Sequence, residues 1–319
     1  MKFDSFILFL FISIALAYFF PQLATFEGGS ILGYITTIGV SLIFFFYGLK
    51  LSIADIKFGL SNWRLHVLVQ VTTFLLFPLL LLLFYPLVDT VSQKNLWLSF
   101  FFLAALPSTV SSSVVMVSIA KGNIPAAIFN ASISGLLGVV ITPLWMSLFL
   151  DFHSDHVVVD VYWGLIKEII IPVILGLWLQ RYFGGWAARY SKQLSQFDKT
   201  IILFIVYGSF ADSFLSGVFT SISKLYLLYI FAGCLLLFYA VYGIVLFFAN
   251  YVFHFSKEDR IVALFCGSKK SLTHGSVFGK FLFVNNPNAG LYFLPLMIFH
   301  ALQIFIVTII AQAYHNRKK

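Results

Sequence analysis

The chain has 319 residues, of which 61% are hydrophobic and only 10% are charged. Soluble domains carry about 25% charged residues, so this composition excludes an ordinary soluble domain and predicts a membrane protein. The formal net charge is +8, but the basic residues are spread over short loops, which argues against nucleic-acid binding. The two cysteines, Cys234 and Cys266, lie in apolar surroundings and have neither a disulfide framework nor a metal-binding spacing.

The first apolar run, MKFDSFILFLFISIALAYFF, has the outline of a signal peptide. We interpret it as a membrane helix, because the run is long, Asp4 precedes it and no A-x-A cleavage pattern follows. Nine further apolar segments bring the expected number of spans to ten, each about 20 residues long. The ten spans are placed at residues 7–24, 31–52, 65–87, 96–119, 124–149, 157–181, 200–217, 225–253, 260–282 and 289–313.

The connecting loops predict the orientation. Basic residues follow the even-numbered spans, whereas the opposite loops carry mostly acids, so the positive-inside rule places both termini in the cytoplasm. An even number of spans agrees with this placement. The basic residues are Lys2, Lys50, Lys57, Arg64, Lys121, Arg181, Arg189, Lys192, Lys199, Lys257, Arg260 and Arg317 to Lys319, and the opposite loops hold Glu27, Asp89, Lys94, Asp151 and Asp155.

An internal repeat is suggested by two matches at one offset. Phe46-Tyr47-Gly48 in the second span matches Val206-Tyr207-Gly208 in the seventh, 160 residues later. At the same offset, residues 107–111 in the fourth span fall opposite residues 267–271 in the ninth. Five spans per half is an odd number, so the second copy would be inverted, as in many secondary transporters. The predicted repeats are residues 1–155 and 156–319, and chance similarity of apolar segments is the alternative.

Two spans carry polar interruptions. Pro107 breaks the fourth span within LPSTVSSS, because proline removes a helical hydrogen bond, and Gly267 and Gly275 bracket GSKKSLTHG in the ninth. Paired interruptions in two halves point to a binding site near the bilayer midplane, and the N-termini of half-helices suit an anion. The predicted substrate-binding residues are Ser108, Thr109, Ser111, Ser268, Lys270, Ser271, Thr273, His274 and His300.

Lysines inside a span are costly, by about 2.5–3.5 kcal/mol each on insertion scales, so they usually face the protein interior and have a role. Lys269 could bind an anionic substrate, act as a built-in cation or carry protons; snorkelling towards an interface is the alternative for both Lys269 and Lys270. His274 is either a proton carrier or a satisfied interior histidine. Lys167 and Glu168 are adjacent, cannot face each other along a helix and are expected near the outer interface.

Other polar residues in apolar spans are Gln70, Asn130, His300 and Gln303. His300 and Gln303 lie one turn apart and therefore share a helix face. Taken singly, each of the four is typical of hydrogen bonding between helices. Together with the two interrupted spans, they predict a polar lining.

Several segments together resemble one known family: PSTVSSSVVMVSIAKGN, AAIFNASISGLLGVVITP, LFCGSKKSLTHGSVFGKFLF, VYGSFADSF and LMIFHALQIF. They are similar to the bile acid:sodium symporter superfamily, and most to the branch with the seventh member of solute carrier family 10 and its bacterial homologues. The resemblance covers essentially the whole chain. It implies an all-α fold of ten transmembrane helices in two inverted repeats, with a panel of helices 1, 2, 6 and 7. Helices 3–5 and 8–10 would form a core, in which broken helices 4 and 9 cross.

The resemblance also implies two sodium sites behind the crossing and an organic anion in front of it. The first site falls on Ser112 and Ser113, with Asn130 as a substitute for hydroxyl ligands that this chain lacks. The second falls on Gln70, but Phe265 and Lys269 stand where relatives have a glutamate and a glutamine. An ammonium group would repel sodium there. The implied ion-site residues or substitutes are Gln70, Ser112, Ser113, Asn130, Lys269 and Gln303, with a candidate sodium at Ser112, Ser113 and Asn130.

The expected function is secondary active transport of an amphipathic organic anion by alternating access, with reduced or absent sodium coupling. The expected location is a bacterial inner membrane, where the partners are lipid and a small anion and the chain is a monomer or homodimer. No organic cofactor is expected, and sodium or a proton is the coupling ion. The alternatives are a channel-like or non-transporting regulator of calcium or ion homeostasis, and an ordinary sodium-coupled symporter. An enzyme is not expected, because the chain has no H-E-x-x-H pattern.

Overall fold

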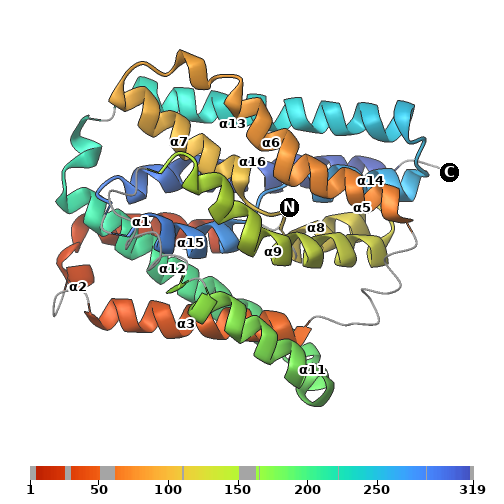
Figure 1. The fold of residues 1–319 in the computed structure, drawn as a ribbon, viewed down its shortest axis with the longest axis horizontal. Helices are drawn as coiled ribbons and strands as arrows, with labels where there is room; N and C mark the ends of the chain where they lie inside the picture. The colour runs from red at the N-terminus through yellow and green to blue at the C-terminus, as the bar shows by residue number, and fades with distance from the viewer. Residues whose placement is uncertain are drawn as a thin grey trace. The chain divides into compact units, whose positions relative to one another are not determined.

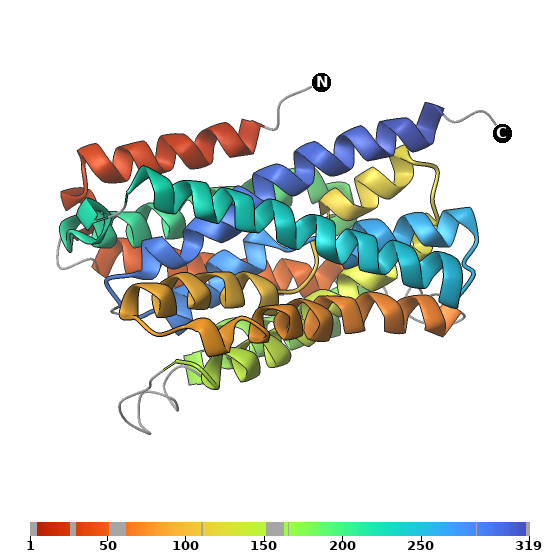
Figure 2. The ribbon, with the colours of Figure 1, turned by 90° about the horizontal axis from the view of Figure 1, so that it is seen from above.

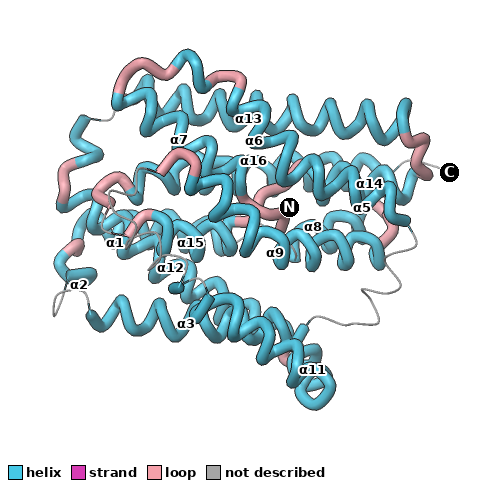
Figure 3. Tube along the Cα trace, in the orientation of Figure 1, coloured by secondary structure: helices cyan, strands magenta, loops and turns pink. Residues whose placement is uncertain are grey.

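The computed structural model describes residues 5–25, 30–50, 62–109, 111–150, 163–164, 166–221, 223–284 and 286–316. Within these ranges every regular element is a helix, and no strand occurs (Figure 3). The predicted all-α class is therefore confirmed. The elements are α1 (Ser5–Phe19), α2 (Gln22–Thr25), α3 (Ser30–Lys50), α5 (Trp63–Val71), η3 (Thr72–Leu76), α6 (Phe77–Leu82), η4 (Tyr85–Leu87), α7 (Val91–Ala105), α8 (Ser111–Ile119), α9 (Ile124–Ser147), η5 (Ile166–Ile170), α11 (Ile171–Arg189), α12 (Ser191–Leu215), η6 (Val218–Ser221), α13 (Lys224–Phe247), η7 (Phe248–Val252), α14 (Lys257–Gly267), α15 (Leu272–Leu282) and α16 (Ala289–Asn316).

Six helical stretches in the described ranges are long and apolar enough to cross a bilayer. Such a chain forms helices because lipid offers no hydrogen-bond partners, so each backbone group must be satisfied within its own segment. The composition and these helices together make the chain a polytopic membrane protein. The six stretches are Ile31–Lys50, Trp63–Leu87, Ile124–Ser147, Ile166–Arg189, Lys224–Val252 and Ala289–Asn316.

The sixth and seventh expected spans differ from their predicted ends. α11 continues to Arg189 and α12 begins at Ser191, so basic residues expected in a loop lie on helices. Aromatic neighbours accompany this extension: the Arg181 guanidinium lies 4.5 Å from the Tyr182 ring centroid. A helix need not stop where its apolar part ends, because charged and aromatic residues continue it at an interface. The basic residues that were predicted in a loop but lie on α11 or α12 are Arg181, Arg189, Lys192 and Lys199.

Part of the predicted orientation rests on residues outside the described ranges. These residues are Lys2, Glu27, Lys57, Asp151, Asp155 and Arg317 to Lys319.

Both expected helix interruptions are present. α7 ends at Ala105 and α8 begins at Ser111, while α14 ends at Gly267 and α15 begins at Leu272. Gly275, however, lies inside α15 and not at a break. A Cβ atom at Gly275 would collide with the side chains of Leu296 and Leu106, so this glycine permits close packing instead of interrupting the helix.

The chain divides into two compact units, which are described separately. Unit 1 comprises Met1–Ser52, Phe149–Ile222 and Ser276–Phe293. In unit 1, α3 and α11 lie side by side (Figure 1). A Cβ atom at Gly48 would collide with the Val173 carbonyl oxygen, and one at Gly176 with the Phe45 carbonyl oxygen. Small residues at such positions let the backbones of membrane helices touch.

Unit 2 comprises Ile53–Leu148, Ser223–Gly275 and Leu294–Lys319. Its first helical stretch runs without a gap from α5 through η3 into α6, the orange segment of Figure 2. α14 packs against α5, α8, α9 and α13, so the first half of the interrupted ninth span is surrounded by helices of its own unit. This packing explains why every residue from Ile261 to Leu272 is buried.

Candidate functional site

The two helix breaks in unit 2 are hydrogen-bonded to each other. Ser271 N donates to the Pro107 carbonyl oxygen at 2.9 Å, and Ser108 Oγ donates to the Cys266 carbonyl oxygen at 2.5 Å. Backbone groups that a break leaves without helical partners need others when buried. Here each break supplies partners to the other. We call residues 106–109 and 268–271 together the paired breaks.

Lys270 is fully buried at the paired breaks. Its Nζ donates to three carbonyl oxygens, those of Thr73 at 2.7 Å, Ala104 at 2.6 Å and Leu106 at 2.7 Å. The same Nζ lies 4.1 Å from the Phe77 ring centroid, a distance that allows a cation–π interaction. An ammonium group has three donors, and all three are used. Lys270 was predicted to contact substrate, but its contacts favour a structural role.

Prolines explain why these carbonyl oxygens are available. Phe77 N donates to the Thr72 carbonyl oxygen in the wider π-helical pattern, and the next residue, Pro78, has no N–H for Thr73. Pro107 likewise has no N–H, and Ser108 N donates to Ser134 Oγ instead of to the end of α7. A positive charge at a helix C-terminus is also favoured by the helix dipole.

Gln303 holds the backbone of Lys270. The Gln303 amide oxygen accepts from Lys270 N at 2.8 Å, and its amide nitrogen donates to the Lys270 carbonyl oxygen at 2.8 Å. The Gln303 amide nitrogen also lies 3.0 Å from His300 Nδ1, which confirms that these two residues share a helix face. α16 therefore fixes the non-helical backbone of the second break.

Lys269 has a different environment from its neighbour. It is also fully buried, but among the described residues its Nζ meets one hydroxyl, Ser112 Oγ at 2.8 Å. Ser112 Oγ in turn lies 2.5 Å from Thr109 Oγ1. Ser112 is in the first turn of α8, the positive end of the helix dipole. We call Lys269, Ser112 and Thr109 together the Lys269 corner. An ammonium group and a helix N-terminus both favour an anion, so this corner has the chemistry of an anion site.

The candidate sodium residues fall into two groups. Ser112 belongs to the Lys269 corner, and its neighbour Ser113 donates from Oγ to the Phe265 carbonyl oxygen at 3.1 Å. Asn130 instead pairs with Gln70, whose amide nitrogen donates to the Asn130 carbonyl oxygen at 3.2 Å. The Gln70 amide oxygen is buried and meets no donor in the described residues.

The remaining predicted site residues make local contacts. Ser271 Oγ accepts from His274 N at 3.2 Å and so caps α15, and it lies 3.0 Å from His274 Nδ1. Ser268 Oγ donates to the Leu264 carbonyl oxygen at 2.6 Å. Thr273 is half-buried in the first turn of α15. Ser111 begins α8, but its side chain lies outside what the structure describes.

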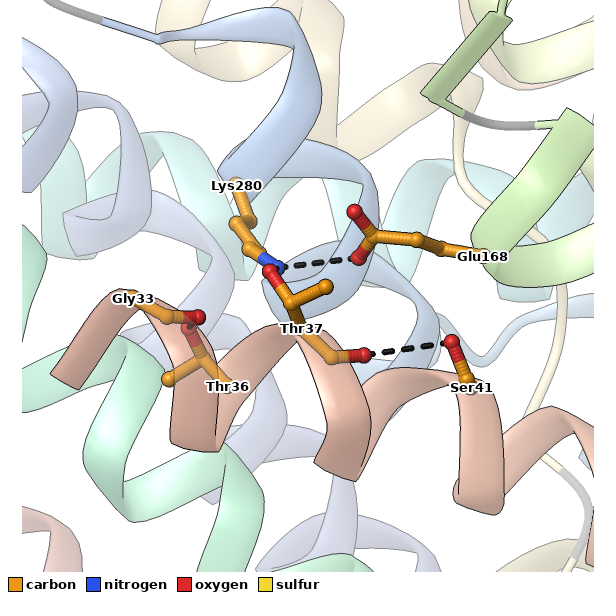
Figure 4. Close-up of polar contacts among 6 residues, drawn as sticks. All are labelled: Gly33, Thr36, Thr37, Ser41, Glu168 and Lys280. Carbon is orange, nitrogen blue, oxygen red and sulfur yellow. Dashed lines mark hydrogen bonds and ion pairs between the residues drawn. The ribbon is translucent and has the colours of Figure 1, made fainter. Parts of the chain in front are cut away.

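A second polar cluster, in unit 1, was missed by the sequence analysis (Figure 4). Lys280 Nζ on α15 lies 3.0 Å from Glu168 Oε2 on η5 and 2.7 Å from Thr37 Oγ1 on α3. Glu168 is therefore a partner in a mostly buried ion pair and not an isolated interfacial residue. The available signal was a single lysine, Lys280, in one apolar segment and an acidic residue, Glu168, in another.

Comparison with known proteins places these features in a family. The model of the SBF-like CPA transporter family matches residues 4–316. "Uncharacterized protein PA2026" of Pseudomonas aeruginosa is 37% identical over 99% of this chain and 94% of its own. "Putative symporter YfeH" of Escherichia coli is 35% identical over 98% of this chain and 93% of its own. "Sodium/bile acid cotransporter 7" of Rattus norvegicus is 30% identical over 86% of this chain and 82% of its own.

Proposed function

Because the chain belongs to the SBF-like CPA transporter family, and is thus a membrane transporter and not an enzyme, we propose that it moves an amphipathic organic anion by alternating access. The observation that carries the proposal is the Lys269 corner. A buried ammonium group with one hydroxyl partner, next to a helix N-terminus, has unused capacity for an anion. The names of two relatives, a putative symporter and a sodium/bile acid cotransporter, agree with an ion-linked carrier.

Lys270 supports the proposal of reduced or absent sodium coupling. Its ammonium group already occupies a cage of three carbonyl oxygens, the kind of ligand that sodium would use. The Lys269 ammonium group donates to the hydroxyl of Ser112, a residue of the first candidate sodium site. We therefore assign Lys270 as a built-in cation and Lys269 as the anion-binding group, which exchanges the roles suggested by sequence.

The division into units supports the proposed architecture. Unit 1 contains the first, second, sixth and seventh expected spans, which would form the panel, and unit 2 contains the third to fifth and the eighth. The proposal includes ten spans, inverted repeats of residues 1–155 and 156–319, a bacterial inner membrane and cytoplasmic termini. Alternating access would expose the Lys269 corner to each side of the membrane in turn.

The test is uptake by purified protein in liposomes. A thermal-shift screen of carboxylated, sulfated and sulfonated amphiphiles, beginning with taurocholate, selects the anion. Lys269→Gln should weaken its binding at least about tenfold, because a hydrogen bond to a charged group is worth about 1.5–3 kcal/mol. Lys167→Gln is the matched control, since that exposed lysine belongs to unit 1, where its Nζ lies 5.2 Å from the Trp163 ring centroid, and makes no contact with the Lys269 corner in the described residues.

Replacing sodium with choline tests the coupling. Uptake within about twofold in the two buffers is expected if Lys270 substitutes for the ion, whereas an absolute sodium requirement would contradict that assignment. Equal binding by the Lys269→Gln variant would remove Lys269 from the substrate site. Unsaturable ion conductance, or no transport of any solute, would favour the channel or regulator instead.

A further inference from the structure

Unit 1 contains a cavity of about 650 Å³, and its lining shares no residue with the paired breaks. α3, α12 and α15 contribute to it, together with the turn before α16. Its walls are mixed: Phe204 and Phe283 are apolar, whereas Thr36, Ser209 and Asn286 bring polar groups. This volume lies within the range of small-molecule sites, and the mixture of apolar and polar walls suits an amphipathic ligand.

Two charged side chains of opposite sign line the cavity. Asp212 on α12 is exposed, and none of the described residues donates to its carboxylate. Lys280 on α15 uses two of its three donors, on Glu168 and Thr37 (Figure 4). Its Nζ also lies 5.2 Å from the Phe281 ring centroid. Among the described residues no oxygen or nitrogen accepts from the third donor of Lys280, and no ion pair joins Lys280 to Asp212.

We propose that this cavity binds a zwitterion, with its ammonium group on Asp212 and its anionic group on Lys280. A simple organic anion fits poorly, because Glu168, outside the lining, already neutralises Lys280, and Asp212, Lys280 and Glu168 together carry one net negative charge. A simple cation would satisfy Asp212 but leave the third donor of Lys280 unused. A zwitterion satisfies both groups and adds no net charge to a cavity inside a membrane protein.

The zwitterion could be the headgroup of a phospholipid or a free solute, and the two sources share the phosphate and ammonium groups of phosphoethanolamine. Apolar walls beside the charges suit an attached acyl chain, which a free solute lacks. The contribution of the acyl chains to the affinity therefore distinguishes a phospholipid from a free solute.

The experiment uses delipidated full-length protein in detergent and measures affinity for three probes. These are dihexanoyl phosphatidylethanolamine, dihexanoyl phosphatidylglycerol and soluble glycerophosphoethanolamine, a phosphodiester with the same zwitterionic group as the first lipid. Binding of the phosphatidylethanolamine at least about tenfold tighter than the phosphatidylglycerol supports the proposal, because only the former carries an ammonium group for Asp212. Comparable affinity for soluble glycerophosphoethanolamine would identify a free solute, and much weaker affinity a lipid. Equal binding of the two lipids, or no binding of any probe, would overturn the proposal.

Variants locate the site. Asp212→Asn should weaken phosphatidylethanolamine binding about tenfold or more, whereas Asp198→Asn, the same change on the same helix but outside the cavity, should leave it unchanged. Gly33→Leu should block the cavity by volume alone, since nothing lies within 4 Å of a Cβ at Gly33. Gly185→Leu is its control, because a Cβ there is equally unhindered and Gly185 does not line the cavity. Unchanged binding in both Asp212→Asn and Gly33→Leu would place the zwitterion elsewhere and overturn the assignment.

Discussion

Lys269 and Lys270 are neighbours in the chain, yet their ammonium groups have different partners. Both lie in the non-helical segment between α14 and α15, where successive side chains do not follow helical spacing. Lys270 reaches three carbonyl oxygens, and Lys269 reaches one hydroxyl. The first arrangement satisfies a cation completely, whereas the second leaves donors for a ligand.

This difference predicts that one substitution destabilises the protein by very different amounts at two adjacent positions. Lys270→Met should lower the free energy of unfolding by about 3–5 kcal/mol, because it leaves buried carbonyl oxygens without donors. Lys269→Met should lower it by about 1 kcal/mol or less, since one hydroxyl contact is lost. Thermal and denaturant unfolding of the purified variants measures both.

A small cation should rescue the first position. In Lys270→Ala, ammonium or methylammonium should raise the unfolding temperature by filling the carbonyl cage, while tetramethylammonium, which has no N–H, should not. Equal losses of stability at the two lysines, or no rescue by either small ion, would contradict a cage built for a cation.

Sequence alone predicted that both lysines would have a role, but it placed Lys270 at the substrate and Lys269 at the ion site, the reverse of the assignment proposed from their contacts. The partners of Lys270 come from two segments more than 150 residues earlier in the chain. Their carbonyl oxygens are backbone groups, which carry no residue-specific signal. In the sequence, only Pro78 and Pro107 indicate that carbonyl oxygens nearby lack a helical donor, because a proline has no N–H to donate.

At the scale of elements, the interruptions were predictable but the π-helical turns were not. Pro107 and Gly267 mark the breaks in α7/α8 and α14/α15. The three π-helical segments of the described chain, η3, η5 and η7, each widen a helix by one residue per turn, which continuous apolar sequence does not reveal. Two of these segments supply partners to the buried lysines: η3 leaves the Thr73 carbonyl oxygen free for Lys270, and η5 carries Glu168, which pairs with Lys280.

The contact between α3 and α11 gives a prediction for a pair of glycines on one helix. Gly176→Ala should destabilise the protein by about 1–3 kcal/mol, because the new Cβ would strike the Phe45 carbonyl oxygen and push the helices apart. Gly185→Ala should be neutral or stabilising by up to about 1 kcal/mol, since its Cβ meets nothing within 4 Å and alanine favours helix. Unfolding of both variants in the same detergent measures the difference, and equal stability would show that α3 and α11 are not in close contact.

At the scale of the whole molecule, the resemblance predicted the family, which the comparisons confirm, and the apolar runs predicted the helical class, which the structure confirms in the described residues. The ion pair of Lys280 and Glu168 escaped prediction because its members are 112 residues apart and neither lies in a break. Charge pairs across helices depend on which faces meet, and a run of apolar residues without clear periodicity does not define a face.

The proposed orientation can be tested with single cysteines. Cys234 and Cys266 are fully buried and should not react with a charged maleimide, so the native cysteines should add no labelling signal. Asp89→Cys and Lys257→Cys are exposed positions expected on opposite sides of the membrane. In intact spheroplasts, Asp89→Cys should be labelled at once and Lys257→Cys only after permeabilisation. The reverse pattern would invert the orientation, and labelling of both in intact cells would contradict the span assignment between them.

The carbonyl cage around Lys270 also bears on the order in which the protein is assembled. During synthesis, Thr73, Ala104 and Leu106 enter the bilayer long before Lys270 leaves the ribosome. Until the lysine arrives, the earlier hairpin holds unpaired carbonyl oxygens, and a ninth segment inserted alone would carry an ammonium that costs about 2.5–3.5 kcal/mol on insertion scales. The carbonyl oxygens and the Lys270 ammonium group therefore satisfy one another. We expect the ninth predicted span to enter the bilayer against the already inserted third and fourth spans and not as an independent helix.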